Sequence, residues 1–157
     1  MKKIGFIGAY DKTDLLIYIA KLLVENDVKV LIVDATTLQK TRYTVPCIMP
    51  SRKYITTYEE MDIAIGFENL QEIMNYAGTQ DFNYDIMLLD IDNRKAFENF
   101  EMYTSDKNYF VTAFDNYSIK KGLETVGQSE EKMLMTKILF SKNMDRDEDE
   151  YLNFLSF

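Results

Sequence analysis

The sequence alternates between short apolar runs and amphipathic stretches, and this alternation limits the fold more than any other feature. Apolar runs span residues 3–9 (KIGFIGA), 28–33 (VKVLIV) and 85–90 (DIMLLD). Their β-branched and leucine-rich composition is typical of strands that are covered on both faces. Strands alternating with helices predict an α/β fold with three layers, in which helices flank a mainly parallel sheet.

Helical spacing of apolar residues predicts a first helix from Asp11 to Asn26. Asp11 is expected to cap this helix, and Asn26 is expected to take the left-handed conformation at its end. Further helices are expected over residues 68–77, 94–102 and 116–126. Gly78 should end the first of these, and Asn116 or Ser118 should cap the last. The remaining strands are expected over residues 54–57, 61–67, 109–113 and 133–140, followed by an acidic loop and an amphipathic tail (YLNFLSF).

The chain has 157 residues, which predicts one domain with a substantial core spanning residues 1–157. It contains no histidine, and this excludes His-ligated zinc, Ser-His-Asp triads and Cys-His nucleophiles. The single cysteine, Cys47, excludes an internal disulfide and a CxxC site. Any catalysis is therefore expected to use carboxylates, lysine, tyrosine or a bound ion.

The net charge is −8, from 18 basic and 26 acidic side chains. An acidic chain argues against binding nucleic acid or anionic lipid as the main function. The longest apolar run, residues 15–20, is far shorter than the roughly 20 residues that span a bilayer, so membrane insertion is not expected. The N-terminus has neither the length nor the flanks of a signal peptide. We therefore expect a cytoplasmic protein.

Ligand sites in parallel sheets lie beyond the carboxyl ends of the strands. The segments expected at that edge are residues 8–12, 34–39, 90–93, 114–116 and 141–143. Asp34 and Asp90 end two neighbouring apolar runs, and a carboxylate at this place is suited to a metal ion or to phosphate chemistry. Loop main-chain groups could equally satisfy both side chains.

The loop GAYDKT, the strand that ends at Asp34 and the strand that ends at Asp90 together resemble the ParA/MinD-type branch of the P-loop ATPases. The resemblance covers most of the chain, including VKVLIVDATTLQ, NYDIMLLDIDN, YFVTAFDNYSIKKGLETVGQ and TKILFSKN. It implies a glycine-rich loop around the phosphates of ATP or ADP, with strand-end aspartates that manage Mg²⁺ and water. Members of the family usually continue past this point, so the chain would lack their last elements.

The resemblance assigns the phosphate loop to six residues: Gly8, Ala9, Tyr10, Asp11, Lys12 and Thr13. It also implies Thr13, Asp34 and Asp90 as Mg²⁺ ligands, with Asp34 and Asp90 catalytic if the site is active. Lys12 and Thr13 match the Lys-Thr pair of the family's GKGGxGKT loop, in which glycine N–H groups cradle the phosphate.

Several residues depart from this pattern. Phe6 and Ile7 replace the leading Gly and Lys, and Asp11 replaces the glycine before Lys12. A carboxylate at Asp11 would stand where an anion should bind. Thr36 replaces a second acidic residue, which weakens the case for an activated water. We therefore interpret the nucleotide site as eroded, assign no cofactor firmly, and expect a non-catalytic regulatory or scaffolding subunit. A working ATPase for partitioning, positioning or assembly is the first alternative.

Basic residues gather in a stretch without acidic side chains, between residues 36 and 58. They are Lys40, Arg42, Arg52 and Lys53. This asymmetry suggests a surface for a protein partner, although solvated loop charge gives the same pattern. The resemblance also implies a homodimer in which two copies face each other over the loop edge, as is usual in the family.

A second alternative is a receiver domain. In that interpretation Asp90 accepts a phosphoryl group, Asp34 binds Mg²⁺, and Thr112 with Lys137 or Lys142 completes the site. The P-loop fold and the receiver fold predict different strand orders, because only the P-loop fold places the first strand beside the strand that ends at Asp90.

Overall fold

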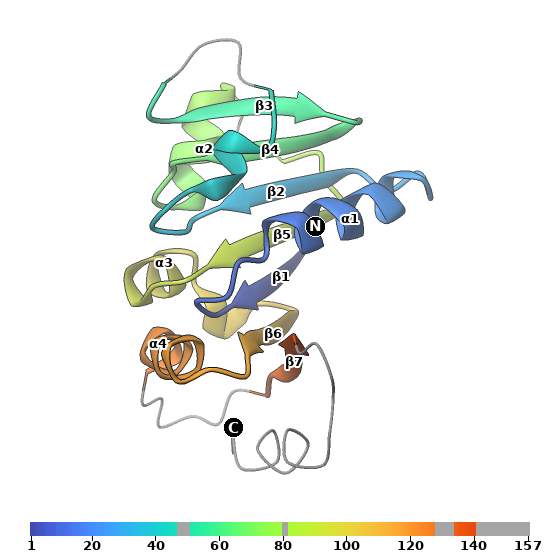
Figure 1. Ribbon diagram of the computed structural model, residues 1–157. Helices are drawn as coiled ribbons and strands as arrows, with labels where there is room; N and C mark the ends of the chain where they lie inside the picture. The colour runs from blue at the N-terminus through green and yellow to red at the C-terminus, as the bar shows by residue number, and fades with distance from the viewer. Residues whose placement is uncertain (47–50, 80–81, 128–133, 141–157) are drawn as a thin grey trace.

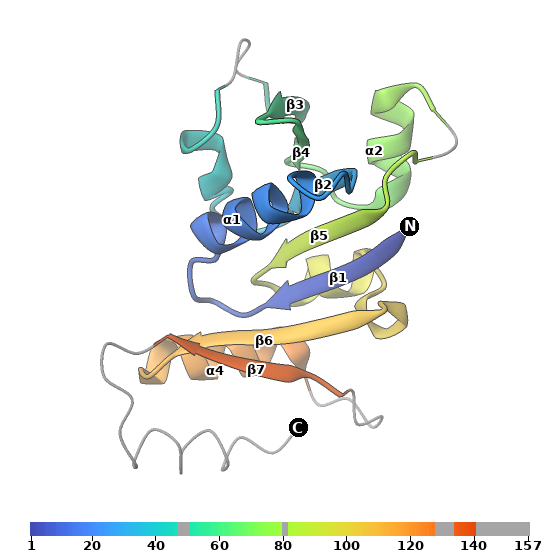
Figure 2. The same cartoon turned by 90° about the vertical axis from the view of Figure 1, so that its right-hand side faces the viewer.

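The computed structural model describes residues 1–46, 51–79, 82–127 and 134–140, and shows one seven-stranded sheet with helices on both sides (Figures 1 and 2). The strands are β1 (Lys2–Ile7), β2 (Val30–Asp34), β3 (Tyr54–Tyr58), β4 (Met61–Ile65), β5 (Ile86–Ile91), β6 (Lys107–Ala113) and β7 (Thr136–Phe140). Their order is β3-β4-β2-β5-β1-β6-β7. Only β3 is antiparallel to its neighbour. The predicted three-layer α/β class is confirmed.

The helices are α1 (Thr13–Val24), α2 (Leu70–Ala77), α3 (Arg94–Asn99) and α4 (Asn116–Val126), with short 3-10 turns η1 (Lys40–Tyr43) and η2 (Met102–Thr104). Right-handed crossovers explain how they divide between the two faces. The step from β1 to β2 moves toward the β3 edge and puts α1 on one face. The connections from β4 to β5, from β5 to β6 and from β6 to β7 each move toward the β7 edge. They therefore put α2, α3 and α4 on the opposite face.

Side chains of the central strands alternate between two buried clusters. Phe6, Ile32 and Leu88 pack with Leu16 and Ala20 of α1 in one cluster. Ile7, Val33, Leu89 and their neighbours pack against the other helices in the second. β2 is buried along its whole length, as its run of apolar residues predicts. This two-sided core fixes the carboxyl ends of β1, β2 and β5 side by side.

Helix ends agree with the sequence predictions in part. Gly78 has φ 67° and ends α2, as predicted. At the end of α1 the left-handed residue is Asp27, with φ 59°, so the assignment to Asn26 is wrong. The cap of α4 is Asp115, whose side chain accepts the N–H of Ser118, and not Asn116 or Ser118. An Asx cap three residues before its N–H donor explains this shift.

Other boundaries differ by a few residues. The expected helix over 94–102 is α3 followed by η2, because Glu101 has φ 52° and interrupts it. Two short strands near residues 54 and 61 were expected, and the structure adds that they form an antiparallel hairpin. Cys47, the acidic loop, Lys142, the expected edge segment 141–143 and the YLNFLSF tail lie outside the described residues. Within the described ranges, no helix has the length and apolarity needed to cross a membrane.

Candidate functional site

The loop between β1 and α1 carries the residues predicted to hold phosphate. It starts at Gly8, which has φ 141° and donates its N–H to Ile91 O at 2.9 Å. A Cβ at this position would clash with the main-chain carbonyl oxygen of Val111. Only glycine fits here, so the loop lies directly against β5 and β6.

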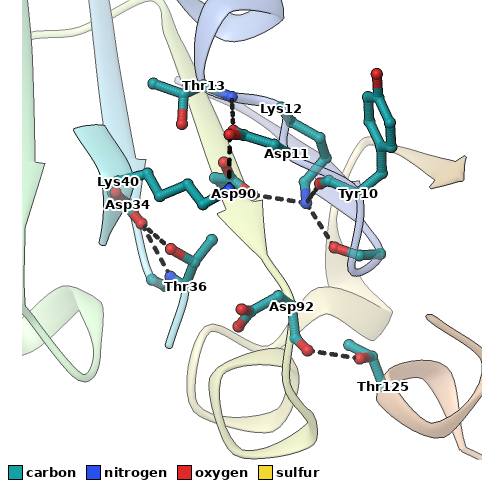
Figure 3. Close-up of polar contacts among 12 residues, drawn as sticks. Tyr10, Asp11, Lys12, Thr13, Asp34, Thr36, Lys40, Asp90, Asp92 and Thr125 are labelled. Atoms are coloured by element: carbon teal, nitrogen blue, oxygen red, sulfur yellow. Dashed lines mark hydrogen bonds and ion pairs between the residues drawn. The ribbon is translucent and has the colours of Figure 1, made fainter. Parts of the chain in front are cut away.

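Lys12 is the most enclosed charged side chain of the loop, with 1% of its surface exposed. Its ammonium donates hydrogen bonds to Gly8 O at 2.6 Å and Tyr10 O at 2.9 Å, and lies 2.9 Å from Asp90 Oδ1 (Figure 3). An ammonium has three hydrogens to donate. The loop therefore accepts two of these hydrogens, and Asp90 of β5 adds an ion pair in which its Oδ1 accepts no hydrogen bond.

Asp11 stands at the start of α1. Its Oδ1 accepts the N–H of Thr13 at 3.1 Å, and its Oδ2 accepts a bond from Lys40 Nζ at 2.9 Å (Figure 3). Burial alone would raise the pKa of this carboxyl, but the Lys40 and Thr13 bonds outweigh it and lower the pKa below its usual value. The bond to Asp11 in turn raises the pKa of Lys40. The N-cap position of α1 is Lys12 and no side chain makes a cap hydrogen bond there, so the assignment of the cap to Asp11 is wrong. Asp11 instead bonds the first helical N–H and ties the helix start to η1.

Asp34 ends β2 and is buried. Its Oδ1 accepts the N–H of Thr36 at 3.0 Å and the Thr36 hydroxyl at 2.6 Å, and its Oδ2 accepts the N–H of Thr41 at 3.2 Å. This carboxylate organises the whole segment from Thr36 to Thr41. The Asp-x-Thr spacing was visible in the sequence, and short hydroxyl side chains commonly form such local turns.

Asp90 ends β5 beside Asp34, to which it is paired in the sheet register. Burial raises the pKa of Asp90 to about 7, since the charge of Lys12 only partly opposes the desolvation and Asp34 adds to it. The Asp90 carboxyl, which is paired with Lys12 at the bottom of the site, therefore changes its protonation near pH 7.

Asp92 is a site residue whose contacts the sequence analysis did not predict. Its Oδ1 accepts the N–H of Thr37 at 2.8 Å, the Thr37 hydroxyl at 3.1 Å and the amide of Asn93 at 2.9 Å. Its carbonyl oxygen accepts the hydroxyl of Thr125 at 2.9 Å. Asp92 therefore links the segment after β2 to the strand end of β5 and to α4. Its place in the DID triplet after an apolar run was the available signal.

The space enclosed by these groups is small. A cavity of about 60 Å³ is lined by residues 9–13 with Thr36, Leu38, Lys40, Asp90 and Asp92. A water molecule occupies about 30 Å³ in the liquid, whereas pockets for organic ligands measure roughly 300–1,000 Å³. The closed loop and the 36–41 segment therefore leave room for a few water molecules.

The four predicted partner-binding residues lie at the same edge of the sheet, and three of them make bonds within the chain. Lys40 binds Asp11, and Lys53 binds Glu72 of α2 at 2.8 Å. Arg42 donates to Gln39 Oε1 at 2.6 Å and to the carbonyl oxygens of Ser51 and Arg52. Intramolecular bonds thus use three of the four cations.

Of the three predicted Mg²⁺ ligands, Thr13 and Asp90 line the same cavity, and Asp34 is paired with Asp90 in the register of β2 and β5. Among the residues that the structure describes, no group of three or more carboxylate, cysteine or histidine side chains is arranged around a common point for a metal ion. The magnesium role of these residues stays a prediction.

The strand order, with β1 between β5 and β6 and β1 leading through a loop into α1, is that of a P-loop NTPase-like α/β fold. In the receiver interpretation the strand of Thr112 would adjoin the strand of Asp90, but β1 separates them. The receiver alternative is therefore inconsistent with this fold.

Solved structures of ParA and MinD type share the fold. A plasmid partition protein from Borrelia burgdorferi has 14% identity and a TM-score of 0.58, and the match covers 98% of this chain and 84% of that chain. A ParA family ATPase from Chlorobium tepidum has 14% identity, a TM-score of 0.54 and coverage of 96% and 79%. The MinC:MinD cell division protein complex from Aquifex aeolicus has 18% identity and a TM-score of 0.53, and the match covers 88% of this chain and 67% of that chain. Neither a protein-family model nor a curated protein matches the sequence.

Proposed function

We propose that this chain is a ParA/MinD-like protein with an eroded nucleotide site, and that it acts as a non-catalytic regulatory or scaffolding subunit through protein partners. The observation that carries the proposal is the bonding of Lys12. Its ammonium donates to Gly8 O and Tyr10 O and forms an ion pair with Asp90, so a phosphate would have to compete with contacts that the chain already makes.

Asp11 supports the same conclusion. A glycine-rich loop binds phosphate through main-chain N–H groups at a helix start, but here the Asp11 carboxylate takes the N–H of Thr13. Two like charges about 4 Å apart repel by roughly 4 kcal/mol at an effective dielectric near 20. Lys40 offsets the charge of Asp11 only while it stays bound to it. A nucleotide would therefore compete with the Asp11 carboxylate for the Thr13 N–H and for the Lys40 ammonium.

The size of the enclosed space also argues against a resident nucleotide. The cavity of about 60 Å³ is several times smaller than sites for ligands of nucleotide size. We therefore derive no reaction step through ATP or Mg²⁺.

Partner binding is proposed for the carboxyl edge of the sheet. Besides the predicted basic residues, Leu38 and Tyr43 project there with 68% and 86% of their surfaces exposed. Exposed aromatic and arginine side chains are common anchors of protein interfaces. Arg52, Leu38 and Tyr43 are the residues that we expect a partner to contact first. The Aquifex MinD structure is a complex with MinC, which makes a protein partner a reasonable expectation for a chain of this fold.

A working ATPase is the second candidate. The observation in its favour is that Lys12, Thr13, Asp34 and Asp90 all reach the same loop (Figure 3). If the loop reopened, these residues would occupy the places that the family uses.

Isothermal titration with ATP and ADP, with and without Mg²⁺, separates the two candidates. We expect no heat of binding for the wild-type chain and a gain of binding for Asp11→Gly. Asp11→Asn is the matched control, because it removes the charge and keeps a side chain. Micromolar binding to the wild type, with turnover that Lys12→Ala abolishes, would overturn the proposal.

A further inference from the structure

The outer edge of β3 is the most distinctive surface that the proposed function leaves unused. β3 is the first strand of the sheet order, and no further strand lies beside it in the described part of the chain. Its sequence, YITTY, contains no charge, proline or glycine. Natural edge strands usually carry such residues, which prevent pairing with another chain.

Hairpin geometry determines which main-chain groups face outward. β3 and β4 are joined by Glu59 and Glu60, both with positive φ (45° and 66°), as in a two-residue primed turn. In such a hairpin the flanking pair, Tyr58 and Met61, exchanges hydrogen bonds. Alternation along the strand then turns the N–H and C=O groups of Ile55 and Thr57 away from β4.

The ends of β3 carry opposite charges. Arg52 and Lys53 precede the strand, and Glu59 and Glu60 follow it. Asn-Gly would suit the turn better, since a non-glycine residue is strained in the left-handed region. Two glutamates at these positions place negative charge there in spite of that strain.

We propose that the β3 edge binds a second copy of this chain, in an antiparallel strand pair about a two-fold axis at Thr56. Ile55 and Thr57 of one copy then exchange main-chain hydrogen bonds with Thr57 and Ile55 of the other. This register is the one that pairs outward-facing residues with each other.

Charge complementarity selects the same register. Pairing about Thr56 brings Lys53 opposite Glu59 of the second copy and Arg52 opposite Glu60, at both ends of the strand pair. Within one copy Lys53 pairs with Glu72 and Glu59 with Lys21, but these side chains are all more than a third exposed. Exposed pairs of this kind exchange partners at little cost.

A single strand pair buries less than the roughly 1,200 Å² of a stable interface, so the dimer should form only at high protein concentration. Sedimentation velocity between roughly 10 μM and 1 mM measures it, since weak interfaces have affinities in that range. We expect a concentration-dependent dimer of the wild type. A wild type that remains monomeric throughout would overturn the proposal.

Two charge-reversed variants test the register. Arg52→Glu with Lys53→Glu, and Glu59→Lys with Glu60→Lys, should each stay monomeric alone because like charges then face each other. A mixture of the two should dimerise again, since every pair becomes complementary. Dimerisation of either variant alone to the wild-type extent, or a mixture that stays monomeric, would contradict the pairing.

A third variant tests the main-chain bonds without touching charge. Thr57→Pro removes an outward N–H that β4 does not use, and edge strands tolerate proline at such positions. It also removes the Thr57 hydroxyl bond to Asp62 of β4 at 2.6 Å, so Thr57→Val is the control for that loss. We expect circular dichroism to show a folded chain and sedimentation velocity to show a monomer. A folded dimer would refute the proposal. Glu59 and Glu60 lie at the opposite end of the sheet from the phosphate loop, so a dimer formed over that loop would not respond to their reversal. The result is therefore independent of the nucleotide experiments.

Discussion

Lys12 and Asp90 form a buried ion pair, with 2.9 Å between Nζ and Oδ1 and side-chain exposures of 1% and 4%. The pair joins the start of α1 to the end of β5, and it lies beneath the loop that would hold phosphate. Because both partners are removed from water, each depends on the other for its charge.

Replacement of Lys12 by methionine should destabilise the chain strongly. The substitution leaves two carbonyl oxygens and a buried carboxylate without their cation, and breaking a buried pair costs about 3–5 kcal/mol. Urea unfolding measures the change. Lys21→Met is the matched control, because its pair with Glu59 is exposed to solvent and its loss should change stability little. Equal effects of the two substitutions would show that Lys12 is not structurally important.

Stability should depend on pH through Asp90. Burial raises its pKa to about 7 in the folded chain, above the ordinary value of 3.8. The folded state then holds a proton that the unfolded state has lost, so this contribution is complete below about pH 4 and is lost as the pH rises through about 7. Unfolding free energies measured between these limits should fall with pH. Asp90→Asn should flatten that slope, and an unchanged slope would contradict the assignment.

Gly8→Ala should cost roughly 3 kcal/mol or more, because it adds both backbone strain at φ 141° and a clash with the Val111 carbonyl. Gly78→Ala is the control. It also has a positive φ, but no atom lies within 4 Å of its Cβ, so only strain of roughly 1–2 kcal/mol remains. Thermal unfolding of the two variants separates the clash from the strain. A loss of stability in Gly8→Ala no larger than in Gly78→Ala would mean that β6 can move away from the added Cβ.

Thr36→Val should loosen the segment over the site. The Thr36 hydroxyl donates to Asp34 and accepts the N–H of Gln39 at 3.0 Å, so its loss costs about 1–3 kcal/mol. Amide exchange at residues 36–41 should quicken. Thr37→Val removes a single, exposed bond to Asp92 and should change exchange less. Equal protection in both variants would argue against the role of Asp34 as the organising group.

The order of elements could be predicted because it follows from local signals. Apolar runs such as residues 28–33 and stop signals such as Gly78 act over a few residues. The edge location of Asp34, Asp90 and Lys12 followed from the rule that strand ends gather in parallel sheets. Departures at Asp115 and Asp27 are shifts of one or a few positions, within the usual uncertainty of helix ends.

The contacts within the site could not be predicted in the same way. Whether Lys12 points outward or folds back onto Gly8 O depends on long-range packing of β5 against β1. The pairing of Lys40 with Asp11, and of Thr37 with Asp92, depends on how the segment after β2 crosses the loop. Such bonds join residues far apart in sequence, so no local pattern predicts them.

The position of β1 affects how the chain is made. β1 leaves the ribosome before β5 and β6, yet these two strands are its neighbours in the sheet, with Lys2 paired to Ile86 and Ile4 to Lys107. The apolar segment KIGFI must therefore remain without its sheet partners until the residues of β5 and β6 have been synthesised. Long-range pairing of this kind slows folding and exposes nascent chains to aggregation. The hairpin of β3 and β4 can therefore form before the centre of the sheet, which is completed only when β6 has been synthesised.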